Sequence, residues 1–305
     1  MLLSYFTPAF NAEKTLPDLY KSLCSQTNKD FEWIVVNDGS EDSTSDLIKT
    51  YIKDSPFLIR FFEQKNGGKH RAYNRAILEC RTELLCCVDA DIVLRRDATE
   101  VLLREWKDYS VNPRIAGIVV PLYYKNIMQS INLKQDFKGF SSSVPAVGKM
   151  PELYHKYKYV GETMYPFRTK ILKKYLFPDI SGEKFMTEST MFLPISKKYK
   201  VHWVNECLGE SIYLSGGLTD RRFYHQVHSP LSTLLFYKIC AIYQINFLGR
   251  AMGCGCYYAW KKVFRLTETK YFEKYRISFC EKTAGFLLIP HYVRLFRNNL
   301  KKLKE

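Results

Sequence analysis

The chain has 305 residues, of which 46% are hydrophobic and 25% are charged, so it can bury a substantial core and is not a disordered segment. Its formal net charge of +15 favours an anionic partner: a nucleic acid, a phosphorylated substrate or an acidic membrane surface. No stretch offers the ~20 uninterrupted apolar residues of a membrane-spanning helix, because residues 231–248 are interrupted by Lys238, Gln244 and Asn246.

The elements predicted from the N-terminus onward alternate between strands and helices. The apolar residues 2–7 predict a strand that ends at Pro8, and they lack the basic flank and the length of a signal peptide. Further strands are predicted at 31–36, 57–63 and 84–88, and helices at 12–26, 43–52 and 70–80. This alternation is typical of the α/β class, in which helices cover both faces of a mostly parallel sheet.

The loop after each of the four predicted strands contains residues that could bind a ligand. Ligands of open parallel sheets bind beyond the carboxyl ends of the strands, so the loops that follow them should meet at one edge. These loops contain Pro8, Ala9, Phe10 and Asn11; Asp38; Gly67, Gly68 and Lys69; and Asp89 and Asp91. An aromatic ring, several carboxylates and a basic helix start should therefore converge.

The stretch CCVDADIVL, residues 86–94, ends a buried strand with two carboxylates one residue apart. An extended course would point both carboxylates to the same side, where they can hold a hard divalent cation. The alternative is a strand that simply enters a solvated turn. A glycine-rich dinucleotide motif and a P-loop are absent, so a cation on Asp89 and Asp91 is the better candidate for holding a diphosphate.

Four ordered segments carry a family resemblance: TPAFNAEKTL, IVVNDGSEDST, NGGKHRAYNRAI and LLCCVDADIVL, all within about the first 100 residues. They resemble the inverting nucleotide-sugar glycosyltransferases of family 2, which have the GT-A fold, a Rossmann-like, mostly parallel sheet. GEKFMTEST and YLSGGLT further resemble bacterial enzymes that build capsular polysaccharides and exopolysaccharides. The expected organisation is a catalytic domain at 1–220, with a nucleotide-binding half at 1–100 and an acceptor half at 101–220, followed by a helical extension at 221–305.

The resemblance implies roles for the residues of the predicted edge. Phe10 would stack on the nucleobase, Asp38 would hydrogen-bond it, and Asp89 and Asp91 would hold the ribose and Mg²⁺ or Mn²⁺. The remaining implied donor-binding residues are Pro8, Ala9, Glu13, Lys69 and Arg71. Each reading has a structural alternative: a buried core ring for Phe10, a local Asx turn for Asp38 and a solvated helix start for Lys69.

Transfer with inversion also needs a carboxylate that accepts the proton of the acceptor hydroxyl. The family commonly takes it from a Glu-Asp pair, whereas here Glu188 is followed by Ser189. We expect Glu188 to be the base, with Glu183 as the alternative. The structural alternative is a helix N-terminus at which Thr187 is the cap and the dipole favours Glu188.

The acceptor half is less informative in sequence. IAGIVVPLYY, residues 115–124, predicts a strand, and the polar residues 126–150 predict a mobile loop. Residues that could meet an acceptor sugar are Tyr159, Glu162, Tyr165 and Phe167. The Q-x-x-R-W signature of processive polymerases is missing, which favours the transfer of one sugar per encounter.

Residues 221–305 hold 16 Lys or Arg against four Asp or Glu, and they read as basic, aromatic helices. Such helices either lie on an anionic membrane or pack on the catalytic domain. The nine scattered cysteines indicate reduced thiols and a cytoplasmic protein, which could dock peripherally on the inner face of the plasma membrane. We read GCGC at 253–256 as a helix-packing contact and not as a metal site.

The sequence thus predicts a metal-dependent transfer of one sugar from a nucleotide-diphosphate donor, expected to be a UDP-sugar. The acceptor would be a glycan or a polyprenyl-diphosphate-linked sugar in bacterial surface polysaccharide synthesis. Two alternatives remain: a sugar-nucleotide-binding protein without catalysis, and a metal-dependent nucleic-acid-processing protein. A nucleic-acid partner is not expected, because the basic charge lies in the tail, away from the carboxylates.

Overall fold

In a computed structural model of the chain, the described residues are 1–124, 140, 144–157, 159, 161–212, 217 and 220–303. They form two compact units. The first unit is Met1–Leu176 with Lys198–Gly217, and the second is Phe177–Lys197 with Leu218–Glu305. The break after residue 217 lies close to the predicted boundary at 220, but residues 177–197 group with the C-terminal helices.

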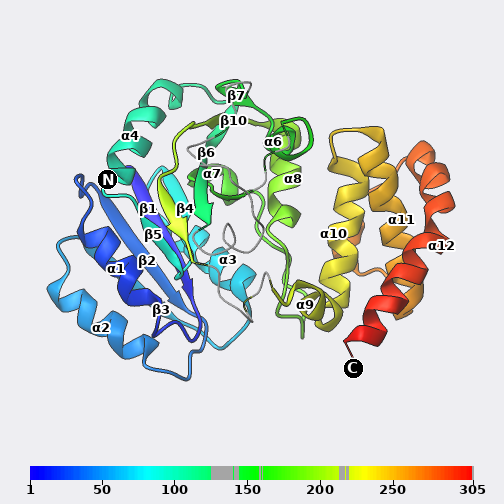
Figure 1. Cartoon of the computed structure of the whole chain (residues 1–305), viewed down its shortest axis with the longest axis horizontal. Coiled ribbons are helices and arrows are strands. Elements are labelled where there is room, and N and C mark those ends of the chain that lie inside the picture. The colour runs from blue at the N-terminus through cyan, green and yellow to red at the C-terminus, as the bar shows by residue number, and fades with distance from the viewer. Residues whose placement is uncertain are drawn as a thin grey trace. The chain divides into compact units, whose positions relative to one another are not determined.

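A parallel sheet forms the N-terminal half of the first unit, in the order β3-β2-β1-β4 (Figure 1). Its strands are β1 (Leu3–Ala9), β2 (Phe31–Asn37), β3 (Leu58–Glu63) and β4 (Leu84–Cys87). All residues of β2 and six of the seven in β1 are buried, as expected for apolar strands covered on both faces. The four strands predicted from the sequence are therefore confirmed.

Alternate side chains of these strands pack against helices on the two faces of the sheet. Tyr5, Trp33 and Val35 belong to a core cluster shared with α1 (Leu16–Cys24), α2 (Thr44–Asp54) and α4 (Ala98–Tyr109). Phe6 points to the other face, where its ring contacts Tyr73 of α3 (Lys69–Glu79) at a centroid distance of 5.2 Å. Helices therefore cover both faces, as predicted.

Helix α1 begins four residues later than predicted, because residues 12–15 form a separate turn. The amides of Thr15 and Leu16 both donate to the carbonyl of Ala12, at 3.1 and 2.9 Å. Pro17 then lies in the first turn of the helix, where a missing N–H costs nothing.

Antiparallel strands extend the sheet beyond β4 and make it mixed. The long strand β6 (Ile115–Tyr124) matches the predicted IAGIVVPLYY run. It pairs in parallel with two strands and antiparallel with two others. The strands added here are β5 (Ile92–Leu94), β7 (Val147–Gly148), β8 (Glu162–Met164), β9 (Phe167–Arg168), β10 (Lys200–Trp203) and β11 (Gly209–Ser211). Two short helices, α6 (Met150–His155) and α7 (Thr169–Leu172), flank them.

Arg168 anchors β9 between β4 and β6. Its guanidinium is buried and donates to the carbonyls of Ile115 at 3.0 Å and Ser110 at 2.6 Å, and to the carboxylate of Glu83 at 2.7 Å. The same group lies over the ring of Trp106, 4.5 Å from its centroid. A buried cation with this many partners fixes the junction of the parallel and antiparallel parts of the sheet.

The second unit is helical, as the tail was predicted to be. Its elements are most of α8 (Ser189–Lys198), α9 (Arg222–His228), α10 (Pro230–Tyr243), α11 (Phe247–Phe264), η1 (Lys270–Phe272) and α12 (Phe279–Lys302). Within the described ranges, none of the helices combines the length and apolarity needed to cross a membrane.

The GCGC stretch lies in α11 and packs between helices. A Cβ at Gly253 would meet the backbone of Ala241 in α10 at 2.6 Å, and one at Gly255 would meet Leu288 of α12 at 2.8 Å. The glycines therefore allow close approach on both sides, and the helix-packing reading is confirmed. All nine cysteines are free thiols.

Candidate active site

The loops that follow the parallel strands meet at one edge of the sheet, as predicted. The amide of Asp38 donates to the carbonyl of Ala9 at 2.8 Å, joining the ends of β1 and β2. The amides of Gly67 and Gly68 donate to the Asp38 carboxylate, and Lys69 reaches Asp89. Four chain segments distant in sequence thus form a single site.

Asp38 organises the loop that precedes α3. Its buried carboxylate accepts hydrogen bonds from the amides of Gly67 at 2.9 Å and Gly68 at 2.7 Å, and from the Gln64 side chain at 2.7 Å. The local Asx turn considered for Asp38 is made by its neighbour instead, because the side-chain Oδ1 of Asn37 accepts the Ser40 amide at 3.0 Å. Asp38 acts across the edge and not within its own turn.

Gly39 makes this close approach of two loops feasible. Its φ is +76°, and a Cβ there would lie 2.7 Å from the backbone nitrogen of Asn66. Any larger residue would push the loop of residues 64–68 away from the end of β2.

Lys69, the first residue of α3, is part of an ion pair and not a solvated helix start. Its ammonium donates to Asp89 Oδ2 at 2.6 Å, and both side chains are about a quarter to a third exposed, at 25% and 32%. A partly exposed pair adds little to stability, so its main effect is to orient the carboxylate. Lys69 also brings a positive charge to the edge where a phosphate would bind.

Asp91 lies in a tight turn and not in an extended segment. The amide of Ile92 donates to the carbonyl of Asp89 at 3.1 Å, and the Asp91 carbonyl accepts the Ile212 amide at 2.9 Å. The expected extended course of the D-x-D stretch is therefore wrong, because the chain turns back at once into β5. The two carboxylates are held by this turn and by pairing with β11.

The Asp91 carboxyl group lies where negative charge is in excess. Burial, followed by the charges of Asp89 and Glu162, raises its pKa from 3.8 to about 7, and Lys69 offsets only part of this. A divalent cation would relieve the repulsion between these carboxylates. Asp89 and Asp91 therefore fit Mg²⁺ or Mn²⁺, which prefer carboxylate oxygens and keep open positions for phosphate and water.

The ligand set would be small. Among the described residues there is no group of three or more His, Cys, Asp or Glu side chains placed to hold a metal ion. Such a site suits a cation that is shared with the phosphates of a substrate and not one enclosed by the protein.

Phe10 follows β1 directly, and its ring is 51% exposed, so it is not the buried core ring of the structural alternative. The next residue, Asn11, has φ +49° and accepts the Glu41 amide at 2.9 Å. Glu13 accepts the Ser43 amide at 3.1 Å, which ties this loop to the start of α2. The turn after β1 thus presents an aromatic ring to solvent while its backbone is fixed.

Pro8 and Ala9 end β1 in register with Val36 and Asn37 and support this turn. Arg71 braces the neighbouring loop, because its guanidinium donates to the carbonyl of Gly67 at 2.5 Å. All of the predicted donor-side residues of the first unit therefore lie on the loops or element ends of this edge.

The predicted acceptor-side residues divide between core and site. Phe167 is 1% exposed within β9, so its predicted contact with an acceptor is wrong. Tyr159 is also buried and donates to the carbonyl of Glu162 at 2.9 Å, whereas Tyr165 shares a 2.7 Å contact with the hydroxyl of Tyr154. Glu162 is close enough to Asp91 to affect its pKa. Most of the predicted mobile loop, and most of YLSGGLT, lie outside the described residues.

The two base candidates belong to the second unit and differ in what they bind. Glu183 is 6% exposed, and its carboxylate accepts the amides of Leu231 at 2.7 Å and Ser232 at 2.5 Å. It caps the first turn of α10. Glu188 precedes α8, and its carbonyl accepts the amides of Met191 at 2.9 Å and Phe192 at 3.1 Å. The predicted helix N-terminus is present, but α8 begins at Ser189, so Glu188 lies just before the helix.

Comparison with known proteins identifies the family of the chain. The profile of the family described as Glycosyl transferase family 2 matches residues 4–176, more than half of the chain.

The chain belongs to glycosyl transferase family 2.

Several curated relatives share the family 2 segment. The chain is 35% identical over 113 residues to the dolichyl-phosphate β-glucosyltransferase ALG5A of Trichomonas vaginalis, covering 34% of this chain and 35% of that protein. It is 35% identical over 156 residues to the chondroitin synthase of Escherichia coli, covering 46% and 23%. It is 28% identical over 157 residues to the poly-β-1,6-N-acetyl-D-glucosamine synthase of Staphylococcus epidermidis, covering 48% and 38%. The matches span between 23% and 38% of the length of these relatives.

Solved structures confirm the GT-A fold of this family 2 chain. TarS 1–349 of S. aureus, in complex with UDP-GlcNAc, has a TM-score of 0.61 at 16% identity, over 96% of this chain and 81% of that one. The mannosyltransferase PcManGT of Pyrobaculum calidifontis, in complex with GDP-Man and Mn²⁺, has a TM-score of 0.52 at 13% identity, over 96% and 73%.

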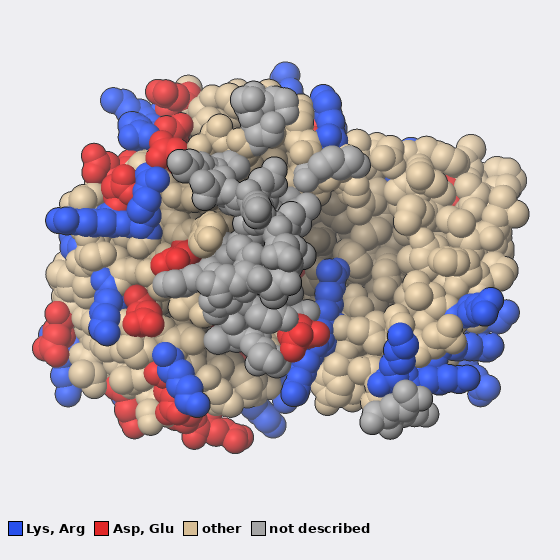
Figure 2. All heavy atoms as spheres, viewed as in Figure 1, with Lys and Arg blue, Asp and Glu red and all other residues tan. Residues whose placement is uncertain are grey.

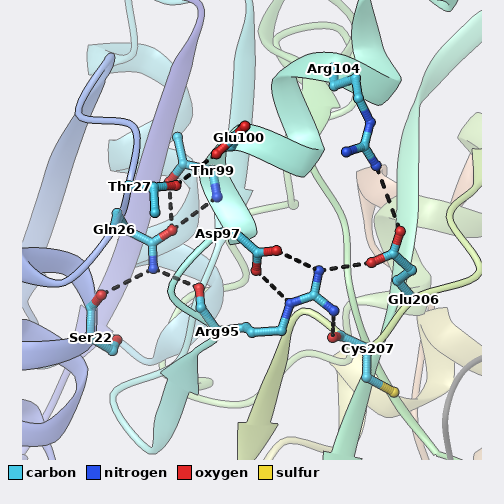
Figure 3. A network of polar contacts seen from close by, with 10 residues as sticks. All are labelled: Ser22, Gln26, Thr27, Arg95, Asp97, Thr99, Glu100, Arg104, Glu206 and Cys207. Carbon is cyan, nitrogen blue, oxygen red and sulfur yellow. Dashed lines mark hydrogen bonds and ion pairs between the residues drawn. The ribbon is translucent and has the colours of Figure 1, made fainter.

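A network of ion pairs and hydrogen bonds next to Asp91 was not predicted from the sequence (Figure 3). Arg95 binds Asp97 through two nitrogens, at 2.5 and 3.1 Å, and donates to Glu206 at 2.8 Å and to the carbonyl of Cys207 at 3.2 Å. The Arg95 amide also donates to the carbonyl of Leu208 at 2.8 Å. These contacts clamp the chain just after β5 to the chain just before β11, the two strands that frame Asp91.

The same network reaches the segment that follows α1. Gln26 donates to the carbonyl of Arg95 at 2.8 Å and accepts the amide of Thr99 at 2.9 Å (Figure 3). Arg95 lies 111 residues from Glu206 in sequence, so no local pattern pairs them. The one sequence signal was the pair of arginines, Arg95 and Arg96, directly after the D-x-D strand.

Proposed function

We propose that this family 2 chain transfers a sugar, with inversion, from a nucleotide-diphosphate donor bound at the carboxyl edge of the sheet. The observation that carries the proposal is the pair Asp89 and Asp91 beside Lys69, with the Asp91 pKa raised by burial and by the charges of Asp89 and Glu162. Such a site is suited to a cation and a diphosphate together.

The donor would lie across the loops that the structure brings together. Phe10 offers its exposed ring to a nucleobase, and Asp89 offers its carboxylate to a ribose hydroxyl. Pro8, Ala9, Glu13 and Arg71 shape the surrounding loops. Asp38 reaches the base only at the cost of loop contacts, because its carboxylate already accepts the amides of Gly67 and Gly68. The UDP-GlcNAc complex of TarS, which shares the fold, supports a UDP-sugar.

The cation would be Mg²⁺ or Mn²⁺, held by Asp91 with Asp89. When bound, it would neutralise the charge that develops on the leaving diphosphate. Lys69 would add a second positive charge on the same side and keep Asp89 oriented. The Mn²⁺ in the structure of PcManGT, another protein of this fold, supports the assignment.

For the base we favour Glu188. Glu183, the alternative, is buried and committed to two amides of α10, so releasing it to accept a proton would uncap that helix. Glu188 directly precedes α8, and its backbone carbonyl accepts the amides of Met191 and Phe192 in the first turn of that helix. It would accept the proton of an acceptor hydroxyl as the glycosidic bond forms on the opposite face of the sugar.

The acceptor would be a glycan or a sugar on a polyprenyl diphosphate. The reaction would belong to the synthesis of a bacterial surface polysaccharide. The similarity to a poly-β-1,6-N-acetyl-D-glucosamine synthase and a chondroitin synthase supports a polysaccharide product. A lipid-linked acceptor would bring the enzyme to an anionic membrane surface, at the inner face of the plasma membrane.

The test is turnover of a panel of nucleotide sugars, with and without Mn²⁺, by the chain and by Asp91→Asn. We expect turnover that requires the cation and falls by at least about a hundredfold in Asp91→Asn. The matched control is Asp46→Asn, because Asp46 is an exposed carboxylate on α2. Metal-dependent turnover that persists in Asp91→Asn would contradict the proposal.

A second variant separates an enzyme from a sugar-nucleotide-binding protein without catalysis. Glu188→Gln should keep donor affinity, measured by calorimetry, and lose turnover. If the unmodified chain binds a donor but no acceptor or water ever receives the sugar, the binding protein is the better description.

A further inference from the structure

The outward face of α12 changes along its length from apolar to basic. Eight of its exposed residues recur at helical spacing on one side: Phe279, Thr283, Phe286, Leu287, Pro290, Arg294, Arg297 and Lys301. Phe279 is 82% exposed and Leu287 is 83% exposed. The opposite side already packs within the second unit through Gly285 and Phe296. In the part of the chain that the structure describes, the helix therefore also has an exposed face.

Helix α11 contributes to the same side through Tyr258, whose ring stacks on Phe286 of α12 at a centroid distance of 5.2 Å. Between the two helices lies a shallow groove of about 510 Å³, lined by Tyr258, Lys261, Lys262, Phe286, Ile289 and Pro290. We call the exposed residues of α12, with those of α11 named in this paragraph, the α11–α12 face.

The one acidic residue within α11 and α12, Glu281, does not offset the charge of the face, because it is 8% exposed and pairs with Arg250 at 2.8 Å. Glu268, in the segment that follows α11, pairs with Lys238 at 2.7 Å. No Asp or Glu occurs among the outward residues of α12 named above. Figure 2 shows Lys and Arg gathered toward the C-terminal ends of α11 and α12, while the N-terminal ends are largely of other residue types.

We propose that the α11–α12 face is a docking surface for an anionic lipid bilayer. Large apolar side chains at one end match the boundary of the acyl chains, and uncompensated Lys and Arg at the other match lipid phosphates. A nucleic acid would use the cations, and single-stranded bases could stack on Phe, but exposed Leu side chains would add little to its binding. A protein partner would favour an apolar core surrounded by a polar rim, whereas here the apolar and basic residues lie toward opposite ends of the helix.

The test is flotation of the full 305-residue chain with vesicles of phosphatidylcholine, alone or mixed with phosphatidylglycerol, and without donor or acceptor. We expect binding to the mixed vesicles that weakens as salt is raised, because the Lys and Arg contribution is screened. Pure phosphatidylcholine should bind much less. Vesicle binding is measured without sugar transfer, so its failure and the failure of the proposed function are separate results.

Two variants address the two ends of the face. Replacing Arg294, Arg297 and Lys301 by Gln should reduce the partition coefficient on the order of a hundredfold, since each cation near the surface adds about 1 kcal/mol. Replacing Phe279, Phe286 and Leu287 by Ser should reduce it by at least about tenfold, because their apolar surface would no longer be buried. Both sets are exposed, so the fold and the turnover of a soluble acceptor should be retained.

Matched controls come from the first unit. Ile52, Leu78 and Val111 are also exposed apolar residues, and replacing them by Ser should leave vesicle binding unchanged. Lys21, Lys49 and Lys53 offer the equivalent charge control when replaced by Gln. Equal losses in the face variants and the controls would overturn the proposal.

Two measurements distinguish a lipid bilayer from a second copy of the chain and from a nucleic acid as the partner of the α11–α12 face. If the chain is oligomeric without vesicles and the Ser variant makes it monomeric, a second copy occupies the face and the proposal is wrong. Binding of an oligonucleotide that outcompetes the mixed vesicles, and that the Gln variant alone abolishes, would overturn it in favour of nucleic acid.

Discussion

Asp38 Oδ2 accepts the amide of Gly68 at 2.7 Å, so the end of β2 holds the N-terminus of α3 in place. The ammonium that orients Asp89 belongs to the next residue, Lys69. A carboxylate that the resemblance assigns to the nucleobase therefore also determines where the metal-site lysine lies.

Asp38→Asn should weaken both the fold and donor binding. The amides of Gly67 and Gly68 donate to different oxygens of Asp38, so the NH₂ group of Asn would face one of these two donors and leave it without an acceptor. We expect the free energy of unfolding to fall by about 1.5–3 kcal/mol, as for hydrogen bonds to a charged group. Urea unfolding checks this, with Asp54→Asn on the exposed end of α2 as control. Equal unfolding free energies in the two variants would contradict the assigned role.

Without a cation, stability should fall as pH rises from about 4 to about 7. The Asp91 pKa is raised from 3.8 to about 7 in the folded chain, so in this window the folded state holds a proton that the unfolded state has lost. Folding in this window therefore takes up a proton on Asp91, and this uptake becomes less favourable as the pH rises. Thermal unfolding across the pH range measures the effect, and Asp91→Asn should remove it.

Cation binding should release a proton in the same window. Mn²⁺ needs the ionised Asp91 carboxylate, so its affinity should increase with pH and level off above about 7. Calorimetry in buffers of different ionisation enthalpy counts the released protons. Glu162→Gln removes one of the charges that raise the Asp91 pKa, and it should shift the onset of binding to lower pH. An unchanged onset would show that Glu162 does not act on the site.

Arg95→Lys should impair the metal site more than the fold. Lysine cannot bind Asp97 through two nitrogens and also reach Glu206, and so the chain before β11 would lose its clamp. We expect a loss of about 1 kcal/mol in stability, because these side chains are partly exposed, and a larger proportional loss of Mn²⁺ affinity. Arg104→Lys is the control, because Arg104 reaches Glu206 only at 3.6 Å. Similar Mn²⁺ affinities in both variants would argue against a positioning role.

Arg168→Met should destabilise the first unit strongly. It would leave Glu83 and several carbonyls without the buried guanidinium, at a cost of about 3 kcal/mol or more. The double variant Arg168→Met with Glu83→Gln should recover part of this, because the uncompensated carboxylate is gone. Chemical denaturation of the single and double variants gives the comparison, and a double variant weaker than the single one would speak against the ion pair.

The parallel half of the fold could be predicted because its signals are local. The runs of β1 and β2 are apolar on both faces, and the rule for sheet edges then places Phe10, Asp38 and Asp89 together. The antiparallel strands could not be predicted, since β9 has only two residues and depends on Arg168 reaching three distant segments.

The errors at the site have the same origin. The partners of Asp38 lie 26 to 30 residues away, and those of Glu183 lie 48 and 49 residues away. A sequence shows that a carboxylate is present but not which amides it will accept. The turn at Asp89–Asp91 escaped prediction because pairing of β5 with β11, distant in sequence, reverses the chain.

The order of residues along α12 also sets a direction. The helix has 24 residues and is therefore about 36 Å long at 1.5 Å per residue. With Phe279 and Leu287 toward one end and Arg297 and Lys301 toward the other, the helix would lie on a bilayer at a slope, with its N-terminal end deeper. A depth probe attached along α12 would then report a gradient of immersion, and the sign of that gradient would give the orientation of the second unit on the lipid surface.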